Sequence, residues 1–261
     1  MSSSADPFGN STIPAGKTSP IDGAPDHRNA QIEERHYPVA VSVEQLALGW
    51  LRTEGASNGS VVTVDHEIGG RQRLGIPWRV PAAQSFSCAV ILRCAIRLED
   101  EALLWIAALV GAARAIETIA GSAPGLGWPD SLIGRDGVTQ GSVAVEAQLG
   151  PGIVQSAVVS LRVNIELLSL AQELTRPIAK AFSEELTLAV GLLETTRAEL
   201  LSEYNVRSVL IGERVRVRLL PKGDTRGTVG PVNGTGNLPL ESPSGMIELL
   251  NPSTVLSVVP I

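Results

Sequence analysis

Lysine is scarce in this chain. Among its 261 residues are 21 basic ones, and only Lys17, Lys180 and Lys222 of these are lysines. Enzymes that transfer phosphoryl or adenylyl groups direct lysine, arginine or metal ions at the negative charge that develops on phosphate. Between Lys17 and Lys180, chemistry of that kind would have to use arginine.

Cysteine, histidine and an excess of positive charge are lacking too. Cys88 and Cys94 lie in one apolar stretch, which favours two buried thiols over a disulfide or a metal pair. The three histidines, His27, His36 and His66, do not have metal-ligand spacing. The net charge of -6 predicts no binding of DNA, which requires a basic footprint.

Long hydrophobic runs are also missing. We expect no stretch of the ~20 apolar residues that a transmembrane helix needs, and the N-terminus lacks the basic-then-apolar pattern of a signal peptide. Residues 1–36 are mainly small and polar, which predicts a disordered segment. The sequence therefore predicts a soluble, cytoplasmic protein without a membrane partner.

Hydrophobic periodicity predicts an α+β domain over residues 37–203 and a small β-barrel over residues 204–261. In the first domain, the pattern indicates three helices: 43–52, 101–119 and 176–201. It indicates four strands there: 61–64, 85–93, 142–148 and 155–164. Five short segments separated by Gly, Pro, Asn and Asp indicate the barrel strands: 213–220, 227–232, 237–241, 246–249 and 255–259.

Residues 66–78 (HEIGGRQRLGIPW) place two arginines among glycines. Gly70 and Gly75 permit close backbone approach and positive φ. Arg71 and Arg73 put two guanidinium groups on one loop, which suits phosphate or carboxylate. The alternative interpretation is a surface loop with two solvated arginines.

This loop resembles the G-R-G-R-x-G-x-x-W loop of biotin–protein ligases, in which the arginine loop closes over biotin and the phosphate of the adenylate. The matching positions of the motif are occupied by Gly70, Arg71, Arg73, Gly75 and Trp78. Gln72 replaces its middle glycine, and Glu67 replaces the glutamine that usually precedes the loop. The resemblance implies that the matching residues bind biotin or the adenylate.

Further segments resemble the same family in the same order. Residues 127–131 (GWPDS) are similar to its K-W-P-N-D segment, 139–144 to its lysine-bearing strand K-L-A-G-I-L, and 160–164 (SLRVN) to G-x-G-x-N. The C-terminal section resembles the family's SH3-like β-barrel. The resemblance covers residues 37–261 and implies ligand roles for Trp128 and Asn164. A core tryptophan and a residue that closes a strand end are the structural alternatives.

The chain departs from these motifs where they carry charge. The family's lysine positions are Gly127 and Thr139, so no catalytic residue is assigned. The two glycines of G-x-G-x-N, where that strand passes close to the ligand, are Ser160 and Arg162. Arg162 or Arg135 remains open as a replacement for a missing lysine. Losing one cation at such a site commonly costs about 3 kcal/mol of transition-state stabilisation.

Three hypotheses for function follow from the resemblance. The first is a ligase that joins biotin to ATP (with Mg), forms biotinoyl-5′-AMP and transfers biotin to a lysine of a biotin carboxyl carrier protein. The second is an inactive pseudo-ligase that binds biotin or the carrier, and the third is a relative of lipoate–protein ligases. The arginine loop and the barrel favour the biotin branch. We expect no DNA-binding repressor role, because no helix-turn-helix is predicted; homodimerisation is left open.

Overall fold

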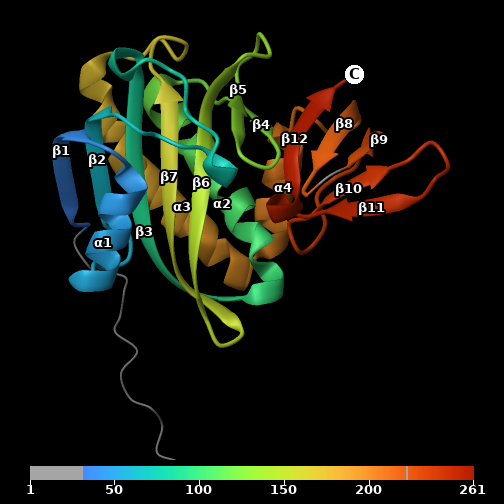
Figure 1. Ribbon diagram of the computed structural model, residues 1–261, viewed down its shortest axis with the longest axis horizontal. Coiled ribbons are helices and arrows are strands. Elements are labelled where there is room, and N and C mark those ends of the chain that lie inside the picture. The colour runs from blue at the N-terminus through green and yellow to red at the C-terminus, as the bar shows by residue number, and fades with distance from the viewer. Residues whose placement is uncertain (1–31, 222) are drawn as a thin grey trace, which may run out of the picture. The chain divides into compact units, whose positions relative to one another are not determined.

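The computed structural model describes residues 32–221 and 223–261, and it confirms the predicted α+β class (Figure 1). A seven-stranded mixed sheet has the order β1-β2-β3-β7-β6-β5-β4. Its strands are β1 (Glu34–Ala40), β2 (Val61–Glu67), β3 (Ser85–Arg97), β4 (Gly125–Gly127), β5 (Ser131–Ile133), β6 (Thr139–Gly150) and β7 (Ile153–Asn164). Strands β1 and β2 are parallel, and the other neighbours are antiparallel.

Helices cover both faces of this sheet. They are α1 (Val43–Thr53), α2 (Ala102–Ala120), α3 (Thr175–Thr195) and α4 (Arg197–Arg207). Because side chains alternate along a strand, β7 directs Leu161 and Val163 into the core shared with α2 and α3. Val158, of opposite parity, packs in a second core with α1. Ser160 and Arg162 therefore point to the α1 side of the sheet.

The C-terminal part forms a five-stranded antiparallel sheet in the order β11-β10-β9-β8-β12. Its strands are β8 (Arg214–Leu219), β9 (Asp224–Val229), β10 (Leu238–Glu241), β11 (Ile247–Leu250) and β12 (Val255–Pro260). Their inward residues, such as Val217 and Leu240, join the main hydrophobic core. The predicted domain boundary between residues 203 and 204 falls within α4 and stays a prediction.

The structure differs from the predicted elements in three places. The single helix over 176–201 is two helices, interrupted at Thr196 with φ -136° and ψ 52°; β-branched threonines favour such a break. The strands β4 and β5 were not predicted. Strand β1 begins at Glu34, inside the segment expected to be disordered, whose residues 1–31 lie outside the described part.

The expectation about membrane-spanning length also needs correction. Helix α2 is long and apolar enough to cross a membrane by length and composition, with a mean hydropathy of 1.7 over its best window. In the structure, 78% of that window is buried inside the protein. The helix therefore packs as a core helix does, and its burial accounts for its composition.

Helix α2 packs closely against α3 at Gly111, which gives a test of this packing. A Cβ at Gly111 would lie 2.9 Å from Cα and 3.0 Å from N of Leu186. We expect Gly111→Ala to lower the free energy of unfolding by about 1–3 kcal/mol, although alanine favours helix. Gly191→Ala in α3, where a Cβ meets nothing within 4 Å, should raise it by about 0.5–1 kcal/mol. Urea denaturation measures both, and a Gly111→Ala variant as stable as the wild type would contradict the packing.

Candidate functional site

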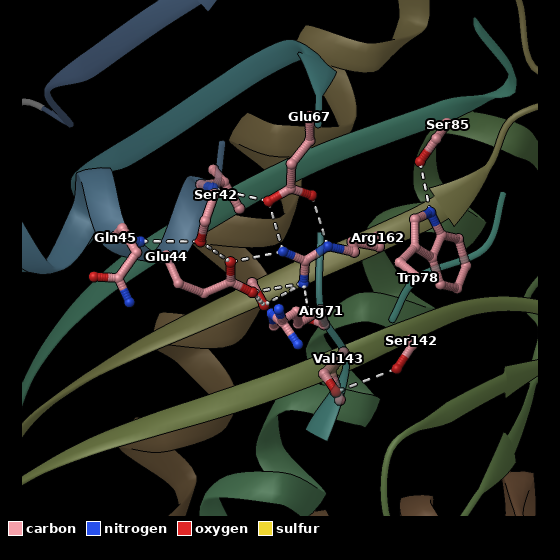
Figure 2. A network of polar contacts seen from close by, with 12 residues as sticks. Ser42, Glu44, Gln45, Glu67, Arg71, Trp78, Ser85, Ser142, Val143 and Arg162 are labelled. Atoms are coloured by element: carbon pink, nitrogen blue, oxygen red, sulfur yellow. Dashed lines mark hydrogen bonds and ion pairs between the residues drawn. The ribbon is translucent and has the colours of Figure 1, made fainter. Parts of the chain in front are cut away.

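Arg162, on β7, lies between two carboxylates that come from distant parts of the chain (Figure 2). Its side chain is 1% exposed. Nε and Nη2 donate to the two oxygens of Glu67, each at 2.7 Å, and Nη2 also donates to Oε2 of Glu44 at 2.6 Å. Glu44 stands at the start of α1 and Glu67 at the end of β2. We call Glu44, Glu67 and Arg162 the Arg162 cluster.

Further hydrogen bonds satisfy the remaining donors of the Arg162 guanidinium. Nη1 of Arg162 donates to the backbone oxygen of Arg71 at 2.6 Å and to Oγ of Ser160 at 3.2 Å. With these, all five N–H groups of the guanidinium have acceptors. The Ser160 hydroxyl donates to Glu44 Oε1 at 2.6 Å, and the backbone N–H of Val43 donates to Glu67 at 2.8 Å. No donor of Arg162 is left for a ligand.

The ionised forms of Glu44 and Arg162 stabilise each other. Burial disfavours the charged form of Glu44, but hydrogen bonds and the charge of Arg162 outweigh this effect and hold the pKa of Glu44 below its usual value. Burial likewise disfavours the guanidinium, yet its bonds to Glu44 and Glu67 raise the pKa of Arg162. Glu44 and Arg162 therefore stay ionised, and removing Arg162 would leave Glu44 as a buried charge without its counter-ion.

The arginine loop, residues 66–78, lies directly against the Arg162 cluster. A Cβ at Gly70 would lie 2.6 Å from Glu67 Oε2 and 3.0 Å from Arg162 Nε, so only glycine fits there. The loop continues through Leu74 and Gly75, both at positive φ (59° and 72°). The side chain of Arg162 lies between β7 and this loop, because its Nη1 donates to the backbone oxygen of Arg71.

The two loop arginines have different environments. Arg73, with a side chain 4% exposed, forms an ion pair with Asp130 at 3.1 Å. It also donates to the carbonyl oxygens of three C-terminal residues: Pro252, Val255 and Leu256. Burial raises the pKa of Asp130, although Arg73 opposes this shift. Arg71 is exposed, and its Nη1 donates to the backbone oxygen of Gly75 at 3.0 Å. Of these two arginines, Arg71 alone offers its guanidinium to solvent.

The other predicted ligand residues make internal contacts. Trp78 Nε1 donates to Ser85 Oγ at 2.7 Å. Trp128 is buried, and its Nε1 donates to the Gly236 backbone oxygen at 3.4 Å. Asn164 Oδ1 accepts from the backbone N–H groups of two following residues, at 3.1 and 3.2 Å, and so closes the end of β7. These contacts match the structural alternatives for Trp128 and Asn164, whose ligand roles stay predictions.

Both positions that match the family's lysines line a separate cavity of about 580 Å³. Gly127 lies on β4 and Thr139 begins β6, and Trp128 contributes to the wall. Arg135, which is exposed, is the one charged residue among the described residues that line the cavity. Arg162 is not part of this lining, so it does not supply the positive charge missing from positions 127 and 139.

Glu44 is a residue of the cluster that no sequence motif indicates. Glu67 and Arg162 each depart from a family motif, but Glu44 lies 118 residues from Arg162 and no local pattern connects them. Within 32–221 and 223–261, no group of three or more His, Cys, Asp or Glu residues could hold a metal ion.

Comparison with known proteins gives related sequences. No protein-family model matches the chain. It is 27% identical over 200 residues to the biotin–[acetyl-CoA-carboxylase] ligase of Mycobacterium tuberculosis, which covers 70% of this chain and 74% of that protein. It is 26% identical over 129 residues to the bifunctional ligase/repressor BirA of Bacillus subtilis, covering 49% of this chain but only 39% of BirA.

Solved structures share the fold at low sequence identity. Biotin protein ligase from Aquifex aeolicus in complex with biotin and ATP has a TM-score of 0.68 at 16% identity, covering 88% of this chain and 99% of that one. A biotin protein ligase-like protein of unknown function from Silicibacter has a TM-score of 0.64 at 14% identity, covering 88% and 96%. This chain is thus similar in sequence to biotin–protein ligases and shares their fold.

Proposed function

We propose that this chain is a pseudo-ligase: a protein with the biotin–protein ligase fold that binds a carrier-type protein and does not form an adenylate. The observation that carries this proposal is the closed Arg162 cluster. In the family's motif, the strand that corresponds to residues 160–164 passes close to the ligand with two glycines. Here Ser160 and Arg162 stand at those positions, and the guanidinium of Arg162 already has an acceptor for each N–H.

The residues present do not fit biotin at this place. An added carbon at Gly70 would already lie within 3.0 Å of Arg162, so a bicyclic ligand has no room between the loop and β7. Displacing Arg162 to make room would leave Glu44 and Glu67 buried without their counter-charge. Breaking a buried ion pair in this way costs about 3–5 kcal/mol, which biotin binding would have to supply.

The charge distribution also opposes adenylation. The reaction brings a carboxylate to the α-phosphate of ATP, so it needs cations directed at both anions. Positions 127 and 139 carry no charge, and Arg73 is engaged with Asp130 and backbone oxygens. The exposed arginines that remain are Arg71 on the loop, Arg79 next to Trp78, and Arg135 in the cavity lining. Each missing cation costs about 3 kcal/mol, or roughly 100-fold in rate.

The competing proposal is an active ligase with biotin and ATP (Mg) as substrates. One specific observation favours it: Arg71 stays exposed on the kept arginine loop and could contact a phosphate. Under either proposal the expected protein partner is a biotin carboxyl carrier domain, because the relative from M. tuberculosis is named for a carboxylase. The two proposals differ in whether the carrier is modified or only bound.

A direct assay separates the two proposals. We expect the purified protein, incubated with biotin, Mg-ATP and a carrier domain, to release no pyrophosphate and to attach no biotin, while calorimetry detects binding of the carrier. Turnover that disappears in Arg71→Ala but persists in the control Arg176→Ala, an exposed arginine on α3, would establish the active ligase instead. Absence of both turnover and carrier binding would refute the carrier-binding function.

Reopening the site tests why biotin is excluded. We expect a Ser160→Gly, Arg162→Gly variant that also carries Glu44→Gln and Glu67→Gln to gain measurable heat of biotin binding, because it removes the bulk without leaving unpaired charges. The matched control carries only Ser160→Gly and keeps Arg162 with both glutamates, so it should not bind. Biotin binding by the wild type as tight as by the opened variant would contradict the exclusion.

The cluster also predicts how stability depends on pH. Arg162 lowers the pKa of Glu44 in the folded state, so Glu44 stabilises the fold above its unfolded-state pKa and loses that contribution as pH falls through the folded pKa. Arg162→Met should lower the free energy of unfolding by about 3–5 kcal/mol at neutral pH. Because burial alone raises a carboxyl pKa, the deficit should shrink in acid. Urea titrations at neutral and acidic pH measure this, and a deficit independent of pH would disprove the assigned charges.

A further inference from the structure

We propose that the outer face of the C-terminal sheet binds an extended acidic segment of a partner protein. Four exposed arginines form this surface, which we call the basic face: Arg214, Arg216, Arg218 and Arg226. The first three alternate along β8 with buried valines, and Arg226 lies on β9 directly opposite Arg216. The pairing register therefore places all four side chains on one side of the sheet.

The sign of the charge on this face is opposite to that of the whole chain. The chain carries a net charge of -6, but the described residues of this face include only two acids beside the four arginines. Asp224 forms an ion pair with Arg216 at 2.6 Å and lies 3.9 Å from Arg218, and Glu241 lies at the margin on β10. Within 32–221 and 223–261, no ion pair engages Arg214 or Arg226. Two arginines are thus available to an anionic partner.

The electrostatic environment of Asp224 supports this assignment. A hydrogen bond from Arg216, with the nearby charges of Arg218 and Arg226, holds the pKa of Asp224 below its usual value. A carboxylate placed on this face is therefore favoured in its charged form. Guanidinium groups bind carboxylates through two parallel hydrogen bonds, which adds geometric specificity to the charge.

The surface is also hollowed where the arginines meet the neighbouring strand. A cavity of about 210 Å³ lies between β8 and β12, and its described lining is Arg216, Arg218, Ser257, Val259 and Ile261. Such a hollow accepts one side chain of a partner between two guanidinium groups and against apolar atoms. The basic face therefore offers a hollow for a partner side chain in addition to its positive charge.

An extended acidic peptide fits this arrangement better than a nucleic acid. Alternate residues of an extended chain repeat every ~6.6–6.8 Å, which is the spacing of Arg214, Arg216 and Arg218 along β8. Carboxylates at alternate positions of a peptide can therefore face successive arginines. A nucleic acid would need a longer basic stripe, and the net charge of -6 opposes its approach. This inference does not depend on the proposed function, because the basic face contains no residue of the Arg162 cluster.

Fluorescence anisotropy with three labelled probes tests the inference. One peptide carries glutamate at alternate positions, a second has the same composition with its glutamates in one block, and a duplex DNA serves as the third. We expect the alternating peptide to bind most tightly and more weakly as salt increases. Arg214→Gln with Arg226→Gln should weaken it about tenfold, or ~1.4 kcal/mol, and this variant keeps the Arg216–Asp224 pair.

The matched control changes two exposed arginines elsewhere, Arg79→Gln with Arg176→Gln, and should bind like the wild type. Thermal unfolding of both variants checks that the sheet stays folded. Equal loss in both variants would mean that the peptide senses only net charge, and this would overturn the proposal. Equal binding of the two peptides, or tighter binding of DNA than of the alternating peptide, would overturn it as well.

Discussion

The buried guanidinium of Arg162 connects three segments that lie far apart in the sequence. Through Glu44 it contacts the start of α1, through Glu67 the end of β2, and through the backbone oxygen of Arg71 the arginine loop. Burying three charges is costly, and their mutual attraction offsets the cost only when the geometry is good and every remaining donor is satisfied. Both conditions are met here, so the three side chains form a unit whose members depend on one another.

The arginine loop is attached at a second point as well. Arg73 extends from the loop to Asp130, which lies between β4 and β5, and to three backbone oxygens of the C-terminal part. Because the backbone of Arg71 is bonded to β7 and the side chain of Arg73 to the C-terminal residues, the loop cannot lift without breaking both sets of contacts. In the resembling family the same loop closes over a ligand. Here the chain's own side chains supply the contacts that hold the loop down.

Much of the fold was predictable because its periodicity is strong. The long strands β3, β6 and β7 and the helix α2 carry regular apolar patterns, and glycines mark the loop. The three-residue strands β4 and β5 are too short for any pattern, and β1 is polar where it starts. The sequence also identified Glu67 and Arg162 as departures from family motifs. It could not reveal that they touch, because contacts across a sheet depend on strand order, which local patterns do not encode.

In the structure, the two departures from the family motifs, Glu67 and Arg162, are in direct contact. An arginine in place of a strand glycine would bury an unpaired cation, and a glutamate in place of the glutamine before the loop would bury an unpaired anion. Each alone is unfavourable, but Arg162 and Glu67 neutralise each other at hydrogen-bond distance, and the same guanidinium also donates to Glu44. Positions 127 and 139, which match the family's lysines, instead carry small, uncharged residues that line a cavity. Along β7, the buried side chains of Ser160 and Arg162 thus stand at the positions of the motif's glycines. At β4 and β6, the positions of its lysines line a cavity in which Arg135 is the one charged residue of the described lining, and the fold accommodates both departures from the motifs.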